Sequence, residues 1–380
     1  MSTSLPDDQR DLWDLARLFL KLGFTAFGGP AAHIAMMRKE VVEKRQWFDE
    51  ESFLDLIGAS NLIPGPTSTE IAFYIGLRRA GWLGLLITST CFILPAAGMV
   101  LAFAWAYVQF GATPQAAGLL YGIKAAVVAI IVEALWKLGR KALKGRLLIC
   151  VGLVVLGLYL AGINVLVLLL GGGLFVVAVR WRTLPKRLNG IPLLAILPAV
   201  AVAEPFSLLG LFLTFLKIGG VLYGGGYVLL AFLRADFVDR LGWLTDKQLL
   251  DAVAVGQFTP GPVFTTATFV GYLTGGWAGA IVATIGIFLP SLIYVSVLSP
   301  YLDQLRKRQW TSDLLDGVNV AALALMAGVG WELARSAVFD LFTGVVSFVC
   351  AVLLLRFQVN SAWLLAGAGV AGILVGVGLN

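Results

Sequence analysis

Long apolar stretches dominate the chain, and short polar stretches separate them. Five of the apolar stretches approach or exceed the roughly 20 residues that a helix needs to cross the hydrocarbon core of a bilayer. These stretches are 82–108, 117–138, 147–179, 277–298 and 362–379. Strands of a membrane barrel would instead alternate apolar and polar residues. The pattern therefore predicts an all-α membrane protein that crosses the bilayer many times.

Composition agrees with this pattern and excludes several other classes. Of the 380 residues, 59% are hydrophobic and 13% are charged, which is more apolar surface than one soluble core could use. The net charge of +6 comes from Lys and Arg in short loops, as the positive-inside rule requires, so we expect no nucleic-acid partner. Three separated cysteines and a single histidine predict no metal site, no cofactor and no enzyme active site.

One interruption lies where a crossing helix is expected: the stretch NLIPGPTST at 61–69. Proline removes a backbone donor and restricts the residue before it, so Pro-Gly-Pro ends one helix and starts another. Pro66 suits the first position of the new helix. Irregular backbone at membrane depth is tolerated only when protein buries it or when it lines a watery cavity. The break is therefore a candidate functional site.

The same interruption occurs twice, because the chain is an internal duplication. FLKLGFTAFGG at 19–29 reappears as FLKIGGVLYGG at 215–225, and IPGP at 63–66 reappears as TPGP at 259–262. Between 19–66 and its counterpart 196 residues later, 15 of 48 positions are identical. We therefore predict a first copy at 1–188 and a second copy at 205–380, joined by a linker at 189–204.

An odd number of crossings per copy would invert the second copy in the membrane. If the Pro-Gly-Pro element enters and leaves on one side, each copy crosses five times, which gives about ten transmembrane helices and two re-entrant or broken elements. Basic loops then share one face, which we place in the cytoplasm. If the element is the kink of a full crossing, the copies are parallel. A crossing by 189–204 would also flip the second copy.

The broken helices have the chemistry of an anion site. A helix that begins at Pro66 directs the amides of Thr67, Ser68 and Thr69 and the positive end of its dipole toward whatever lies in front of it. Glycine turns opposite each break allow close backbone approach. The candidate substrate-binding residues are Lys21, Gly28, Gly29, Pro64, Gly65, Pro66, Thr67 and Ser68 in the first copy, and Lys217, Gly224, Gly225, Pro260, Gly261, Pro262 and Thr265 in the second.

Each of these residues also has an ordinary structural explanation. Glycine and proline are common packing and kink residues in membrane helices, and the two lysines could extend their side chains toward an interface. Because Thr67 and Ser68 stand where the second copy has Val263 and Phe264, the first break is the more polar.

Other charged residues are candidates for coupling or gating. Glu70 follows the first break by one turn, and Thr266 takes its place in the second copy, so Glu70 could carry a proton or form a buried ion pair. Asp55 and Asp251 could cap or pair with a helix, and Arg38 and Arg234 could mark a helix end or a substrate entrance. We interpret the single His33 as structural, and Lys124 and Glu133 could form an intramembrane pair.

The set of motifs resembles the chromate ion transporter family in its long, two-domain form. The resemblance rests on FGGP, RKEVVEKRQW and GASNLIPGPTSTEIAFYIG in the first copy, and on FLKIGGVLYGGGYVLLAFLRADFV and VGQFTPGPVFTTATFVGY in the second. It covers essentially the whole chain. The family's motif positions correspond to Lys21, Gly28, Gly29 and 64–66, and to the residues 196 positions later.

The resemblance implies a secondary transporter in the bacterial inner membrane that exports chromate and confers chromate resistance. Sulfate or another oxyanion is an alternative substrate, and a channel-like anion conduit is an alternative mechanism. Alternating access between the two copies is the expected mechanism. The oligomeric state is open, and a homodimer is compatible with the sequence.

Overall fold

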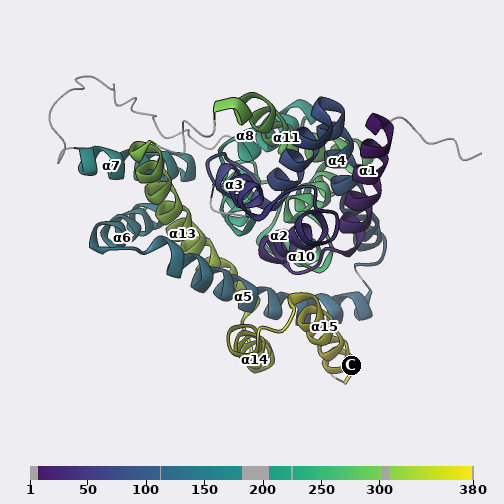
Figure 1. Cartoon of the computed structure of the whole chain (residues 1–380). Coiled ribbons are helices and arrows are strands. Elements are labelled where there is room, and N and C mark those ends of the chain that lie inside the picture. Colours follow the sequence, from purple (N-terminus) through teal and green to yellow (C-terminus); the bar gives the residue numbers. More distant parts are fainter. Residues whose placement is uncertain (1–6, 112, 182–204, 224–225, 302–307, 379–380) are drawn as a thin grey trace, which may run out of the picture.

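The computed structural model describes residues 7–111, 113–181, 205–223, 226–301 and 308–378, and these ranges contain helices and no strand (Figure 1). The first half comprises α1 (Asp7–Thr25), α2 (Gly29–Arg38), η1 (Lys39–Lys44), α3 (Glu50–Ser60), α4 (Thr67–Phe110), α5 (Pro114–Ala142), α6 (Arg146–Leu160) and α7 (Val165–Trp181). The second half comprises α8 (Leu208–Val221), η2 (Gly226–Val228), α9 (Leu229–Leu233), η3 (Arg234–Arg240), α10 (Asp246–Phe258), η4 (Val263–Thr265), α11 (Thr266–Leu298), η5 (Ser299–Tyr301), α13 (Gln309–Ala337), α14 (Leu341–Phe357) and α15 (Ser361–Gly378).

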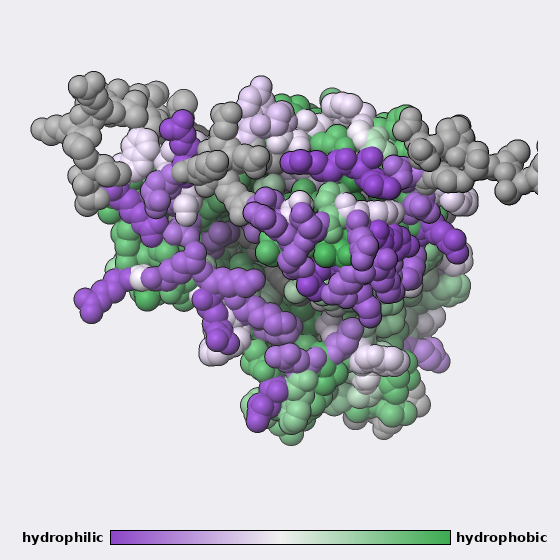
Figure 2. All heavy atoms as spheres, viewed as in Figure 1, coloured by the Kyte–Doolittle hydropathy of each residue, from purple (hydrophilic) through white to green (hydrophobic). Residues whose placement is uncertain are grey.

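Four helical stretches within these ranges are long and apolar enough to cross a membrane: Thr67–Phe110, Pro114–Ala142, Val263–Tyr301 and Gln309–Ala337. Large apolar side chains are exposed on the surface, such as Trp82, Leu153 and Leu341, as expected where lipid is the solvent. Figure 2 shows apolar surface over α14 and α15, while polar residues gather across the middle of the same view. The prediction of a helical membrane protein is confirmed. The number of crossings and the inversion of the copies stay predictions.

Helix α4 is a hairpin of two arms, the arrangement required if the Pro-Gly-Pro element enters and leaves on one side. Ala80 and Gly81 leave the helical region, and Gly81 has a φ of +57°, which glycine adopts without strain. A Cβ on Gly76 would lie 2.4 Å from the carbonyl oxygen of Gly84, so the two helical stretches pack backbone to backbone. We call 67–79 the short arm of α4 and 82–110 its long arm.

The second copy repeats this hairpin in α11. Gly275 and Gly276 leave the helical region, and Gly276 has a φ of +59°. The hydroxyl groups of Thr268 and Thr284 lie 2.7 Å apart, although a straight helix would separate them by about 24 Å. Residues 266–274 form the short arm of α11 and 277–298 its long arm.

After α1 the chain turns back and returns beside it. Gly28 and Gly29 have φ values of +103° and +76°, and Pro30 opens α2. The chain returns through α2 and η1, so Lys21 of α1 meets Glu40 of η1 at 3.0 Å. The five-crossing expectation assumed a first helix that continues to the opposite face. In the structure, α1 and the charged stretch after it form a hairpin.

Contacts at one end of the first copy close this arrangement. Arg79, at the end of the short arm of α4, pairs with Asp11 near the start of α1 at 2.6 Å. The guanidinium group of Arg79 also lies 5.3 Å from the ring centroid of Trp47, in the loop before α3. The α1–η1 hairpin and the pair formed by α3 and the short arm of α4 therefore both begin and end at the same end of the copy.

The second copy folds in the same way, with the same contacts at an offset of 196. Lys217 of α8 pairs with Asp236 of η3, as Lys21 pairs with Glu40. Caps recur too: Asp49 accepts from the Ser52 amide at the start of α3, and Thr245 forms a capping box at the start of α10. The copy boundaries at 188 and 205 stay a prediction, and the linker 189–204 lies outside the described residues.

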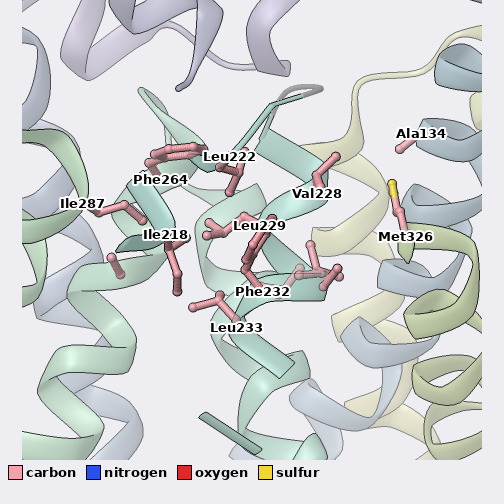
Figure 3. Packing of buried hydrophobic residues seen from close by; sticks show 14 of the residues in the cluster. Ala134, Ile218, Leu222, Val228, Leu229, Phe232, Leu233, Phe264, Ile287 and Met326 are labelled. Carbon is pink, nitrogen blue, oxygen red and sulfur yellow. The ribbon is translucent and has the colours of Figure 1, made fainter. Parts of the chain in front are cut away.

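Buried apolar side chains hold each break in place. Figure 3 shows Ile218 and Leu222 of the second copy close to Phe264 and Ile287. All four side chains are fully buried, and Phe264 packs on Phe288 with ring centroids 6.1 Å apart. Since close-packed side chains resist rearrangement, the backbone breaks are fixed by the core around them.

Helices of the two copies also approach closely through small residues. A Cβ on Gly122 of α5 would lie 1.8 Å from the carbonyl oxygen of Ala368 in α15. A Cβ on Gly317 of α13 would lie 2.5 Å from that of Gly172 in α7. Small residues of this kind let helix backbones approach in membranes, where apolar burial between helices is not a driving force.

Candidate functional site

Each helix break contacts the other copy through a main-chain hydrogen bond. The amide of Gly65 donates to the carbonyl of Leu222 at 2.8 Å, and the amide of Gly261 donates to the carbonyl of Ala26 at 2.9 Å. The two bonds are equivalent, because Gly261 is the counterpart of Gly65 and Leu222 is the counterpart of Ala26, each at an offset of 196. Each Pro-Gly-Pro break therefore binds the chain just before the glycine turn of the other copy. We call this pair of contacts the junction.

The first break presents a helix start to the junction. Gly65 has a φ of +141°, and Pro66 is the extended residue before α4, with no side-chain cap. The Thr69 amide bonds the Pro66 carbonyl at 2.7 Å, so the amides available for a ligand are those of Thr67 and Ser68. The sequence had suggested three such amides.

His33 contacts the first break, although the sequence interpretation gave it a structural role alone. Its Nε2 atom lies 2.8 Å from the carbonyl oxygen of Ala26 and its Nδ1 atom 3.3 Å from the Ser68 hydroxyl. Because a carbonyl only accepts, Nε2 carries the proton and Nδ1 accepts from Ser68. The ring is buried and packs edge-on against Phe92. His33 thus ties Ser68 to the carbonyl group that also receives the Gly261 amide.

Glu70 lies one turn behind the break and is completely buried. Its Oε1 atom is 3.5 Å from the hydroxyl of Ser291, on the long arm of α11, and its Oε2 atom has no partner in the described part of the chain. A Cβ on Gly65 would lie 2.2 Å from Oε1 and 2.3 Å from the Ser291 hydroxyl. The carboxyl group therefore fills the space directly under the break.

The second break is more apolar and has few free polar groups. It leads into η4, where Phe264 is buried, and the hydroxyl of Thr265 donates to the carbonyl of Pro262 at 2.8 Å. The hydroxyl of Thr266 donates to the carbonyl of Val263 at the same distance. A Cβ on Gly261 would lie 2.6 Å from Cβ of Ala96. The predicted ligand Thr265 therefore has its hydroxyl donor occupied.

The two predicted lysine ligands lie in equivalent ion pairs rather than alone. Lys21 binds Glu40, which also receives Lys44 and Arg45, and the side chain of Lys21 is 55% exposed. Lys217 binds Asp236, which also receives Arg240. Each lysine therefore already has a carboxylate partner, with which an anion would compete.

The equivalent arginines make equivalent networks. Arg38 binds Glu43 and Glu50, and Arg234 binds Asp239 and Asp246, the acids 196 positions later. Arg234 additionally binds Glu332 of α13 at 2.6 Å.

A cavity of about 460 Å³ opens beside the second of these networks. Charged side chains and the loop between α6 and α7 line it, including Lys217, Arg234, Asp236, Arg240, Glu332 and Asn164. The cavity joins Lys217 and Arg234, two of the predicted residues, in one polar vestibule.

Asp251 and Asp55, predicted as equivalents, have different surroundings. Asp251 is completely buried, where Lys124 pairs with it at 3.1 Å and the Tyr107 hydroxyl donates to it at 2.9 Å. Asp55 lies on the exposed face of α3. The predicted pair of Lys124 with Glu133 was wrong. Lys124 binds Asp251 of the second copy, and Glu133 is bound by Lys137, one turn after Glu133 on α5.

The remaining predicted residues fall into two groups. Gly28 and Gly29 form the turn between α1 and α2, close to Asn360 at the start of α15. Gly224 and Gly225 lie outside the described residues. Within the described ranges, no group of three or more His, Cys, Asp or Glu side chains could hold a metal ion.

Comparison with known proteins gives two matches to one family model. The model of the chromate transporter family matches residues 13–177 and again 209–373. The chain is 34% identical to a chromate transport protein of Cupriavidus metallidurans over 96% of this chain and 93% of the relative. It is 34% identical to a probable chromate transport protein of Synechococcus elongatus over 90% and 89% of the two chains.

More distant relatives include shorter proteins. An uncharacterized transporter of Bacillus subtilis is 27% identical over 35% of this chain and 67% of its own length. No solved structure matches the chain.

Proposed function

The chain belongs to the chromate transporter family, and on this premise we propose that it exports chromate across the bacterial inner membrane as an alternating-access carrier. Such export would confer chromate resistance. The observation that carries the proposal is the junction, where the break of each copy binds the chain before the glycine turn of the other, Gly65 to Leu222 and Gly261 to Ala26. Sites of this kind, between two repeats and built on discontinuous helices, are typical of secondary transporters.

The first break supplies the recognition chemistry for an oxyanion. The amides of Thr67 and Ser68 and the positive end of the short arm of α4 favour negative charge. The Ser68 hydroxyl donates its hydrogen to His33, so the two amides rather than this hydroxyl are the donors offered to the anion. Sulfate has the same shape and charge as chromate, so we expect it to compete.

Inverted copies are part of the proposal, and the contacts of Tyr107 support them. The long arm of α4 starts beside the Arg79–Asp11 pair, and Tyr107 lies about 37 Å further along it. There Tyr107 binds Asp251 of α10, whose first turn follows Trp243, the counterpart of Trp47. The end of the first copy at which its α1–η1 hairpin begins, and the equivalent end of the second copy, therefore lie at opposite ends of the long arm.

Loop charges support an orientation with the basic ends in the cytoplasm. Lys144, after α5, and Arg180, at the end of α7, both bind Asp316 near the start of α13. Basic segments far apart in sequence thus gather at one end, as the positive-inside rule requires for a cytoplasmic face. An inside-negative potential then favours export of a dianion by about 4.6 kcal/mol per 100 mV.

The lysines enter the proposal as anion partners that exchange. Lys21 leaves Glu40, or Lys217 leaves Asp236, to meet the anion as it approaches from one side or the other. Both lysines lie within the last turns of a helix that leads to the junction. This exchange keeps a charged side chain paired at every stage, which lowers its cost inside the membrane.

Uptake of labelled chromate into everted vesicles tests the function. Vesicles with the wild-type chain, with Lys21→Ala and with the exposed-site control Lys141→Ala are compared at a clamped potential, with unlabelled sulfate as competitor. We expect saturable uptake by the wild type and the control, inhibition by sulfate, and loss in Lys21→Ala. Wild-type uptake equal to that of empty vesicles would remove the assignment. Uptake that neither saturates nor shows counterflow would indicate a conduit instead.

A further inference from the structure

Glu70 is a buried acid without a basic partner. No Lys, Arg or His side chain in the described ranges pairs with it, and its side-chain hydrogen bond there comes from the Ser291 hydroxyl at 3.5 Å. The titratable groups that face it are Tyr74, one turn along its own helix, and Tyr223, which follows α8 in the other copy. Arg78 lies two turns away, on the far side of Tyr74.

The other elements around Glu70 bring no compensating charge. On α2, the Nδ1 atom of His33 accepts from the Ser68 hydroxyl and its Nε2–H donates to the carbonyl of Ala26. On α11, the hydroxyl of Tyr294 donates to the carbonyl of Gly220 at 2.9 Å. An ionised carboxylate in such a place loses its hydration and gains no ion pair, so the neutral acid is the stable form.

The position of Glu70 connects its proton to the anion site. The carboxyl group lies three residues after Thr67 and two after Ser68, whose amides form the proposed anion site, and it packs directly on Gly65 of the junction. A carboxylate there would repel a dianion at the helix start, whereas a protonated carboxyl group would not. The proposed alternating access separates the junction at one stage, at which water would reach the carboxyl group and take up its proton.

We propose that Glu70 is a proton-binding site that must be occupied for the anion to bind, so that one proton accompanies each anion through the transporter. The inference rests on the proposed function and names its coupling ion. In the step itself, Glu70 in the carboxyl form accompanies the bound anion, and after release of the anion the O–H bond breaks to give a carboxylate and a free proton.

Of the two breaks, the first has such an acid and the second does not. At the second break, Thr266 takes the place of Glu70. Ala96 takes the place of Ser291, the residue that contacts Glu70 at the first break. The duplicated scaffold thus carries its acid on one side alone. One proton reduces the charge moved with chromate from two to one, which halves the contribution of the membrane potential.

Anion affinity as a function of pH tests the proposal. Chromate binding to the purified chain is measured by equilibrium dialysis at a series of pH values in which chromate itself is fully ionised. For the wild type we expect Kd to rise about tenfold per pH unit once Glu70 loses its proton. Glu70→Gln, a neutral mimic of the protonated acid, should bind with a Kd independent of pH. Glu51→Gln, at an exposed acid on α3, is the matched control and should keep the wild-type slope.

A second measurement uses the wild-type chain alone and does not depend on a folded variant. Infrared difference spectra of the wild-type chain, recorded while pH is raised without chromate, should show the C=O band of a buried carboxylic acid disappear. Chromate should shift that loss to higher pH. Absence of the band, or a wild-type Kd that does not change with pH, would overturn the proposal, as would a Glu70→Gln variant with the wild-type slope.

The two proposals fail in distinguishable ways. If the wild type binds no chromate but the infrared band titrates, the proton site stands and the substrate assignment fails. If chromate binds with a pH-independent Kd and no such band is present, the substrate assignment stands and the proton site fails.

Discussion

Lys124 and Asp251 form a 3.1 Å ion pair that joins α5 of the first copy to α10 of the second, inside the apolar body of the protein. Asp251 is completely buried, and the side chain of Lys124 is 12% exposed. Tyr107 donates a second bond to the same carboxylate from the long arm of α4. One buried acid thus fixes two first-copy helices against α10.

Removal of the lysine should therefore destabilise the fold more than removal of both charges. Lys124→Met leaves Asp251 buried and without its cation, and we expect a loss of about 3–5 kcal/mol. Lys124→Met combined with Asp251→Leu should recover part of that loss, because no charge is then stranded. Denaturant unfolding in detergent gives the comparison, with Lys141→Met as the exposed control. Equal stability of Lys124→Met and the control would contradict a structural role for the pair.

Gly65→Ala should disrupt the junction. The residue has a φ of +141°, and its new Cβ would meet the Glu70 carboxyl at 2.2 Å and the Ser291 hydroxyl at 2.3 Å. Backbone strain alone costs on the order of 1–3 kcal/mol, and the contacts add to it. We expect a lower Tm and loss of chromate uptake. Gly98→Ala, in the long arm of α4 with nothing within 4 Å of its Cβ, is the control and should leave both unchanged.

His33→Leu installs the residue that the second copy carries at the equivalent position, Leu229. The Ser68 hydroxyl then loses its acceptor, and the Ala26 carbonyl keeps only the Gly261 amide. We expect a loss of about 1–3 kcal/mol in the free energy of unfolding, the cost of an unsatisfied buried polar group. Thermal unfolding of His33→Leu beside Ser68→Ala and the double variant checks this, since the double variant should be no worse than His33→Leu. An additive loss would mean that the two side chains act independently.

Acid should weaken the hairpin of α1 and η1 through Glu40. Burial tends to raise the pKa of this carboxyl, but hydrogen bonds from Lys21, Lys44 and Arg45 outweigh it and hold the pKa at about 2, against an ordinary 4.5. As pH falls, the folded chain takes up this proton at a lower pH than the unfolded chain. The stabilisation is therefore complete above about pH 4.5 and is lost as pH falls toward about 2. The Tm of the wild type should drop across that window, and that of Glu40→Gln should change less. Parallel Tm profiles would show that other acids are responsible.

Much of the site could be predicted because its signals are local and occur twice. Pro-Gly-Pro and the glycine pairs mark backbone breaks by sterics alone, and their constant offset identified the duplication. The ion pairs could have been found in the same way, since Glu40 and Asp236 are both acidic at that offset. A search for equivalent charge rather than equivalent identity would have matched each lysine with its acid.

Other features depend on where the chain reverses its direction, which a hydropathy pattern does not show. Nothing in the composition of 67–110 distinguishes a straight helix from a hairpin, and the turn depends on the positive φ of Gly81. The reversal after α1 likewise depends on Gly28 and Gly29. His33 and Ser291 were missed as site residues because each is a single polar residue without a counterpart, and only the packed structure brings them beside the break.

The two bonds of the junction, from Gly65 to Leu222 and from Gly261 to Ala26, join main-chain atoms only. Bonds of this kind survive side-chain substitution, provided that the backbone can adopt the same path. After the ancestral gene was duplicated, each half could therefore accumulate changes around its break while the contact between the halves persisted. The acid at Glu70 and the hydroxyl at Thr266 are the result of such divergence: evolution could specialise one half without having to redesign the contact that holds both together.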